Sequence, residues 1–234
     1  MNVGRSSCRL HNGVTMPGIG FGTWKLPADE ALPGLVSAAL ECGYRQFDTA
    51  GAYGNDYAVV QALLSADVPR GELFIASKLW NSYRGDKVRK GVRQTLKRCS
   101  LEYLDLLMMH WPASPALHPN WRDINAETWR GMEDLLDEGA VRAIGVSNFP
   151  LNHLEALADT ARIMPMVDQV EFHPGMPDCG EFLRTCSARG IVVQAWSPLG
   201  RGNNNGDNDK NRDFFESLAK KYGKTVSQVL IRYQ

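Results

Sequence analysis

Hydrophobic and polar positions alternate along this chain in two kinds of segment. Short runs of apolar or β-branched residues are each followed by a longer segment in which apolar residues recur at helical spacing. Seven such pairs follow residue 18, and their apolar runs are GIGFGTW, RQFD, LFIASK, YLDLLMMH, VRAIGVSN, PMVDQVEF and IVVQAWS. Strands that alternate with helices predict a parallel sheet, because each crossover helix must cover one of its faces.

Polar or aromatic residues stand at or just after the C-terminal end of nearly every run. They are Thr23, Trp24, Asp48, Lys78, His110, Ser147, Asn148, Gln169, Trp196 and Ser197. An open doubly wound sheet binds ligands at one switch point and uses only two or three strand ends. Because the polar residues are spread over all seven runs, the pattern favours a (β/α)8 TIM-type barrel, whose strand ends meet at one mouth.

The remaining segments predict how this barrel begins and ends. SCRLHNGVTMP has Asn-Gly between apolar pairs and indicates a hairpin that closes the opposite end of the barrel. Asn125 is expected to cap the helix that Gly139 ends. Residues 201–211 are rich in Gly and Asn and predict a loop, with TVSQVLIRYQ as a helix after it. Since no eighth strand or helix follows, we expect a C-terminally shortened barrel with two unpaired edges.

Composition narrows the class of protein. With 234 residues and 44% hydrophobic content, we expect a single domain over residues 1–234. Lys plus Arg equals Asp plus Glu at 26 each, which favours a small-molecule substrate over nucleic acid or a membrane surface. The five cysteines are scattered and lack metal-ligand spacing, so we expect reduced thiols in a cytoplasmic protein and no metal site.

Five motifs, in order along the chain, resemble the aldo-keto reductase superfamily. GYRQFDTAGAYGND resembles its GYRHIDTAxxYGNE, YLDLLMMHWP its DLxLIHWP, VRAIGVSNF its KVRAIGVSNF, MVDQVEFHP its VNQVEFHP, and AWSPLG its AYSPLG. The chain is most similar to small members that resemble 2,5-diketogluconate reductase or prostaglandin F synthase. The resemblance implies reduction of aldehydes or ketones to alcohols by hydride transfer from NAD(P)H, with NADP(H) expected rather than NAD(H).

The catalytic residues implied by this resemblance are Asp48, Tyr53, Lys78 and His110. Carbonyl reduction needs a proton for the oxygen as negative charge develops there. A free tyrosine has a pKa near ~10, and a neighbouring ammonium group, Lys78, is expected to lower it and make Tyr53 the general acid. Asp48 is expected to keep Lys78 charged, and His110 to orient the carbonyl group.

Taken singly, each of these four residues also has a structural interpretation. Asp48 could cap a turn, Tyr53 could be a packed aromatic, Lys78 a solvated strand end and His110 a core histidine. Their order inside the five motifs favours catalysis over these four interpretations.

The resemblance also implies cofactor and substrate contacts. It assigns the nicotinamide carboxamide to Ser147, Asn148 and Gln169, ring stacking to Trp196, and further cofactor contacts to Gly22, Thr23, Ser197 and Leu199. GIGFGTW lacks the GxGxxG pattern of a Rossmann fold, so the dinucleotide is expected to lie extended across a barrel mouth. The expected walls of an apolar substrate pocket are Trp24, Trp80 and Trp111, together with His110.

The chain departs from the family pattern at informative positions. Asp168 stands where the family usually has Asn, and Trp196 where a stacking Tyr is common. The family segment IPKSxxxxRxxEN, which closes the barrel and binds the adenosine 2′-phosphate in relatives, has no counterpart in this sequence.

Two alternatives stay open at this point. One is a cofactor-binding or partner-binding barrel without significant turnover, and the other is an inactive shortened fragment. A complete barrel of this kind is expected to be a monomer. The particular carbonyl substrate is not indicated, because specificity in such barrels depends on loops, here residues 113–124.

Overall fold

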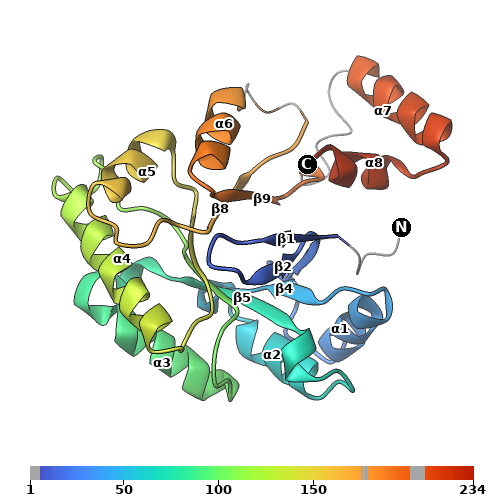
Figure 1. The fold of residues 1–234 in the computed structure, drawn as a ribbon. Helices are drawn as coiled ribbons and strands as arrows, with labels where there is room; N and C mark the ends of the chain where they lie inside the picture. Colours follow the sequence, from blue (N-terminus) through green and yellow to red (C-terminus); the bar gives the residue numbers. More distant parts are fainter. Residues whose placement is uncertain (1–5, 175, 177–178, 201–208) are drawn as a thin grey trace.

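A parallel sheet of seven strands forms the centre of the molecule. The computed structural model describes residues 6–174, 176, 179–200 and 209–234. The strands are β3 (Gly20–Gly22), β4 (Gln46–Asp48), β5 (Phe74–Leu79), β6 (Leu106–Met109), β7 (Ile144–Ser147), β8 (Val167–Glu171) and β9 (Val192–Trp196). Each pairs in parallel with the next in chain order. The sheet curves into a nearly closed barrel with helices outside it, as the sequence predicted (Figure 1).

The helices follow the strands in the predicted order. They are α1 (Leu32–Glu41), α2 (Asp56–Leu64), α3 (Val88–Cys99), α4 (Trp121–Asp137), α5 (Leu151–Ala158), α6 (Gly180–Ala188), α7 (Asp209–Tyr222) and α8 (Val226–Tyr233). Short 3₁₀ turns lie between them: η2 (Gly51–Tyr53), η3 (Arg70–Glu72), η4 (Asn81–Tyr83) and η5 (Gly85–Lys87). In α3 the buried residues recur every three or four positions, so one face packs against the barrel. None of the described helices is long and apolar enough to cross a lipid bilayer.

The prediction that Asn125 caps a helix was wrong. Helix α4 begins one turn earlier, at Trp121, and Asn125 lies inside it, buried. Its side chain accepts a hydrogen bond from Ala113 N at 2.7 Å and donates to Ala113 O at 3.1 Å. Asn125 therefore fixes the loop after β6 rather than the start of the helix. Gly139 does follow α4, with φ +73, as expected for a helix end.

An N-terminal hairpin closes one end of the barrel. Strands β1 (Ser7–Arg9) and β2 (Thr15–Pro17) pair antiparallel. At its tip, the His11 ring bonds to Met164 O at 3.0 Å and Asn12 donates to Arg142 O at 2.9 Å. Both acceptors lie just before strands β8 and β7. The hairpin therefore lies at the N-terminal ends of the strands, as predicted.

The C-terminal region agrees only partly with the sequence prediction. Most of the predicted loop, residues 201–208, lies outside the described residues, but residues 209–211 belong to α7, so the prediction of a loop is wrong for these three residues. Helix α8 is confirmed, and a capping box of Thr225 and Gln228 begins it. Leu230 is the buried residue of α8. Within the described part of the sheet, β3 and β9 each pair with one neighbour only.

Two buried aspartates of the barrel differ sharply in their partners. Asp105 is fully buried, pairs with Arg70 at 2.8 Å and Arg142 at 2.9 Å, and accepts from Ile75 N. Asp168 is also fully buried, but it has no ion-pair partner among the described residues, and only the backbone N–H of Phe149 is placed to stabilise its carboxylate. Burial raises the pKa of Asp168 to about 8, because a charged carboxylate is disfavoured there. Asp168 is therefore held mainly as a neutral acid near pH 7.

Asp168→Asn is expected to flatten the pH dependence of stability. The folded state keeps a proton that the unfolded state loses above its ordinary pKa, so the free energy of unfolding of the parent chain falls as pH rises from about 4 to about 8. The difference in unfolding free energy between the variant and the parent should therefore grow in the variant's favour by on the order of 3 kcal/mol between pH 5 and pH 8. Urea unfolding followed by circular dichroism measures both values. The exposed Asp67→Asn is the control, and equal pH dependence in parent and Asp168→Asn would contradict the expectation.

Candidate active site

Four predicted catalytic residues come from three neighbouring strand ends. Asp48 is the last residue of β4, and Tyr53 follows in the turn η2. Lys78 lies near the end of β5, and His110 follows β6 directly. Because parallel neighbouring strands end at the same edge, these side chains can meet at the barrel mouth. The structure brings all four together.

Lys78 is the centre of this group. Its ammonium donates to the Tyr53 hydroxyl at 3.0 Å and forms an ion pair with the Asp48 carboxylate. The Lys78 side chain is only 2% exposed. Burial alone would lower the pKa of Lys78, but Asp48 and Tyr53 more than offset this and raise it. Asp48 therefore keeps a buried lysine charged, in agreement with the sequence prediction.

Tyr53 differs from the prediction in the direction of its pKa. The sequence led us to expect a lowered value. In the structure burial raises the pKa of Tyr53, Lys78 opposes that rise, and the net direction is upward. The expectation was wrong because desolvation of the phenolate outweighs the attraction of Lys78. Tyr53 is therefore a neutral phenol at physiological pH, with a proton to donate.

His110 packs between Tyr53 and Trp80. The ring centroids lie 5.7 Å from Tyr53 and 5.2 Å from Trp80, both edge to face. Burial, helped by the charge of Lys78, lowers the pKa of His110 to about 4. The imidazole is therefore neutral at pH 7, and can donate from one nitrogen and accept at the other.

The predicted cofactor residues of β7 and β8 are hydrogen-bonded to the catalytic group. Gln169 donates to the Asp48 carboxylate and to Gln194 Oε1, the second bond measuring 2.8 Å. Ser147 Oγ donates to Gln169 O at 2.8 Å. Asn148 Nδ2 donates to His110 O at 3.0 Å. The two predicted sets of residues thus form one polar network.

Trp196 joins this network from β9. Its indole N–H donates to Asn148 Oδ1 at 2.9 Å, and the ring is half-buried. The backbone is left-handed at Asn148, with φ 62, and at Ser197, which follows Trp196, with φ 52. For residues other than glycine this conformation is uncommon and often marks a functional turn. Leu199 lies beyond them, 37% exposed.

The C-terminal end of β3 leaves open space at Gly22 and stabilises the backbone of Asp48 through Thr23. A Cβ added to Gly22 would meet nothing within 4 Å, so the surface above this strand is open. Thr23 is fully buried, and its hydroxyl donates to Asp48 O at 3.0 Å. Thr23 thus fixes the backbone of Asp48.

Two polar residues in this region were missed at the sequence level. Gln194 accepts from Gln169, and Asn55 donates to Thr23 O at 2.8 Å and to Leu26 O at 2.9 Å. Gln194 lies two residues before Trp196 in the same strand, and this alternation was the available signal. Asn55 follows Tyr53 in the motif, but no spacing rule indicated its distant partners.

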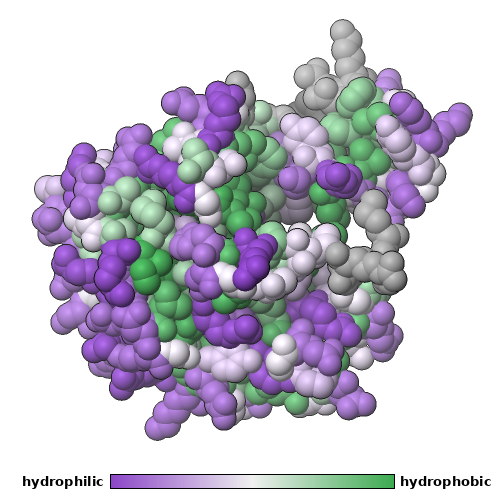
Figure 2. Space-filling view, viewed as in Figure 1, coloured by the Kyte–Doolittle hydropathy of each residue, from purple (hydrophilic) through white to green (hydrophobic). Residues whose placement is uncertain are grey.

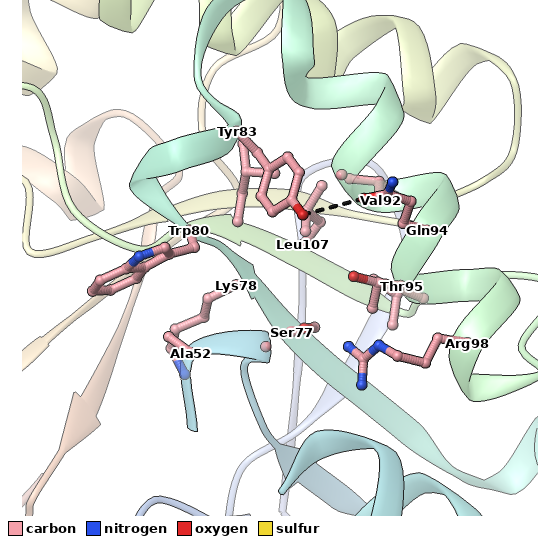
Figure 3. Close-up of a pocket in the computed structure, with 14 residues that line it drawn as sticks. Ala52, Ser77, Lys78, Trp80, Tyr83, Val92, Gln94, Thr95, Arg98 and Leu107 are labelled. Carbon is pink, nitrogen blue, oxygen red and sulfur yellow. Dashed lines mark hydrogen bonds between the residues drawn. The ribbon is translucent and has the colours of Figure 1, made fainter. Parts of the chain in front are cut away.

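The three predicted pocket tryptophans are all partly exposed: Trp24 by 48%, Trp80 by 41% and Trp111 by 45%. Trp80 also lines a cavity of about 470 Å³ between β5 and α3, shown in Figure 3. Trp111 lines a second cavity of about 950 Å³, together with the turns after β5. Among the described residues, no group of His, Cys, Asp and Glu is arranged to hold a metal ion.

The polar network fits the nicotinamide end of a dinucleotide. The N–H and O–H donors of Asn148, Gln169 and Ser147 are engaged within the network, so their oxygens are the groups that can accept from the NH₂ of a carboxamide. They lie beside Asp48 and His110, next to the open surface above Gly22. The half-buried Trp196 offers an aromatic face in the same network.

Known proteins of one enzyme family are similar to this chain. The model of the "Aldo/keto reductase family" matches residues 18–234. Glyoxal reductase of Bacillus subtilis is 39% identical over 98% of this chain and 78% of its own length. Methylglyoxal reductase DkgA of Salmonella typhimurium is 40% identical over 96% of this chain and 78% of its own length. The crystal structure of a Bombyx mori aldo-keto reductase in complex with NADP superposes with a TM-score of 0.85, at 33% identity, over 97% of this chain and 79% of that one.

His110 is expected to show no titration between pH 5.5 and 8. Burial and Lys78 keep its pKa near 4, so its ring stays neutral throughout this range. Imidazole ¹⁵N chemical shifts, assigned with His110→Gln, measure this directly. In Lys78→Met the opposing charge is lost while Asp48 remains, so the pKa of His110 should rise. A His110 signal that titrates near 6.5 in the parent chain would contradict the expected neutral state.

Proposed function

The chain belongs to the aldo/keto reductase family, and we propose on that premise that it reduces small aldehydes and ketones to alcohols in the cytoplasm, with Tyr53 as the general acid. The observation that carries this proposal is the 3.0 Å hydrogen bond from the Lys78 ammonium to the Tyr53 hydroxyl, with Asp48 paired to the same lysine. A reductase needs an acid whose conjugate base is stabilised at the moment the proton leaves. Here Tyr53 is the acid, and the Lys78 ammonium stabilises its conjugate base.

The proton is given by Tyr53 to the carbonyl oxygen as negative charge develops on that oxygen. Burial raises the pKa of Tyr53, so the phenol holds its proton until an acceptor of increasing basicity lies beside it. The phenolate that forms is stabilised by the Lys78 ammonium, which is already in position and needs no reorganisation. Asp48 balances the lysine charge while no phenolate is present. The lysine acts through the tyrosine and does not itself give up the proton.

His110 orients the carbonyl group. Its neutral ring is held against Tyr53 and Trp80, so a donated hydrogen bond and the acid of Tyr53 can converge on one oxygen. A charged imidazolium would compete as a proton donor, and the pKa near 4 excludes it at neutral pH. His110 is therefore proposed as a binding and orienting group.

A nicotinamide would be held by Ser147, Asn148 and Gln169, with Trp196 against its ring. When bound, a reduced nicotinamide supplies the hydride that the carbonyl carbon takes. Gly22, Thr23, Ser197 and Leu199 are proposed to border the rest of the dinucleotide. The NADP in the Bombyx mori relative supports NADP(H) rather than NAD(H) as the cofactor.

We infer the substrate class from the relatives. Two curated relatives at 39% and 40% identity are named for glyoxal and methylglyoxal. Small uncharged 2-oxoaldehydes suit a mouth bordered by Trp24, Trp80 and Trp111, because the indole surfaces bury apolar parts and leave the carbonyl oxygen to Tyr53 and His110.

Tyr53→Phe is expected to lower kcat for methylglyoxal by about 10² to 10⁴, the usual contribution of a general acid. The variant lacks only the hydroxyl, so the affinity for NADPH should change by less than about threefold. Steady-state rates and calorimetric titration measure the two quantities. Tyr57→Phe, at a half-exposed tyrosine one turn along, is the matched control and should keep full activity. Equal kcat in Tyr53→Phe and the parent would end the assignment, and absence of turnover in the parent would favour a binding barrel.

Trp196→Ala is expected to weaken NADPH binding by about fivefold, the loss of roughly 1 kcal/mol of aromatic stacking. The parent chain should bind NADPH more tightly than NADH. Calorimetric titration with each nucleotide gives both results without relying on tryptophan fluorescence. Phe214→Ala, an exposed aromatic of α7, should leave the affinity unchanged. Equal affinity of Trp196→Ala and the parent would remove Trp196 from the cofactor site.

A further inference from the structure

The cavity that Trp80 lines extends along the outer side of strand β5. Side chains alternate across a strand. Lys78 points into the barrel toward Tyr53, so its neighbours Ser77 and Leu79 face outward toward helix α3. Figure 3 shows the resulting hollow, with β5 on one side and α3 on the other. Its volume of about 470 Å³ is within the range of small-molecule sites.

One wall of this cavity depends on a glycine. A Cβ added to Gly91 of α3 would lie 2.6 Å from Cγ of Tyr83, so only glycine lets the tyrosine ring pack flat on the helix. The Tyr83 hydroxyl then donates to Gln94 Oε1 at 3.1 Å (Figure 3). Because the oxygen of Gln94 is engaged, its NH₂ group is the part left to pair with a ligand. The wall thus has a defined shape and presents a donor.

The polar part of the lining is rich in donors. Arg98 pairs with Asp56 through Nη1 at 2.9 Å and Nη2 at 2.5 Å. That pair uses two of the five N–H groups of a guanidinium and leaves three. Asp56 is nearly fully buried, and its carboxylate is paired with Arg98. Ser77 and Thr95 add hydroxyl groups on opposite sides.

The rest of the lining is apolar. It is formed by Val92 of α3, Leu104 just before β6 and Leu107 in β6, and all three are buried. A ligand that matches such a lining has an apolar body and a group that accepts several hydrogen bonds. A carboxylate accepts up to about four and pairs with guanidinium groups strongly.

We propose that the cavity between β5 and α3 binds a small organic carboxylate with an apolar body. Its carboxylate pairs with Arg98 and the Gln94 amide, and its body lies on Leu104 and Leu107. Lys78 and Trp80 also line this cavity, so it adjoins the candidate active site, but Tyr53 and His110 are not among the residues that line it. It also borders Ala52, the residue before Tyr53 in η2, so an occupant contacts the turn that carries the tyrosine.

The test is titration of the chain with 4-fluorobenzoate followed by fluorine NMR. We expect saturable binding in the parent chain, and loss of that binding in Thr95→Trp, where an indole fills the cavity from a half-exposed position of α3. Lys90→Trp places the same side chain on the exposed face of the same helix and should bind like the parent. The neutral 4-fluorobenzyl alcohol should bind about tenfold more weakly, the loss of a charge-assisted hydrogen bond.

Two further variants keep the test decisive. Gln94→Leu removes the amide donor at an exposed helix position and should weaken binding by about tenfold even if Thr95→Trp does not fold. His110→Gln should leave the binding unchanged, because it alters only the candidate active site. The proposal is overturned by absence of saturable binding, by unchanged binding in Thr95→Trp and Gln94→Leu, or by loss of binding in His110→Gln alone. None of these outcomes depends on whether the chain reduces carbonyls.

Discussion

The rest of the candidate active site depends on the buried ion pair between Lys78 and Asp48. An ammonium group that is 2% exposed would be strongly destabilising without a partner, and the Asp48 carboxylate removes most of that cost. The same carboxylate accepts from Gln169 of β8, and the backbone oxygen of Asp48 accepts from Thr23 after β3. One aspartate thus ties together four strand ends. Its position decides where the phenol of Tyr53 can lie.

The hydrogen bonds that continue from this pair explain why catalytic and cofactor residues form one unit. Gln169 contacts Asp48 on one side, and its backbone oxygen accepts from Ser147 on the other. Asn148 then reaches His110 O with its amide and the Trp196 indole with its oxygen. Its left-handed backbone is what allows one short side chain to contact both. A change on the proposed nicotinamide side would therefore be transmitted to the orientation of His110.

The sequence predicted the seven strands, their order and the four converging residues because those depend on local apolar runs and on the rule that parallel strand ends meet. The sequence-based predictions that were wrong concern features that depend on contacts between residues far apart in the chain. Asn125 has the chemistry of a helix cap, but the backbone of Ala113 provides better partners inside the fold. The pKa of Tyr53 was predicted from one neighbour, while its direction depends on how deeply the whole ring is buried. Neither the hydrogen-bond partners of Asn125 nor the direction of the Tyr53 pKa can be derived from the spacing of residues along the chain.

In strand β8, the side of the strand on which a polar residue lies determines its partners and its charge state. Gln169 faces the barrel mouth, where Asp48 and Gln194 satisfy its amide. The preceding residue, Asp168, faces the opposite side, and Cys186 of α6 is its titratable neighbour there. Asp48 is surrounded by donors and stabilises a cation, whereas Asp168 has no ion-pair partner among the described residues and is most stable without charge. The same residue type can therefore be an anion on one strand and a neutral acid on another, because only the inward-facing position shares a cavity with a lysine.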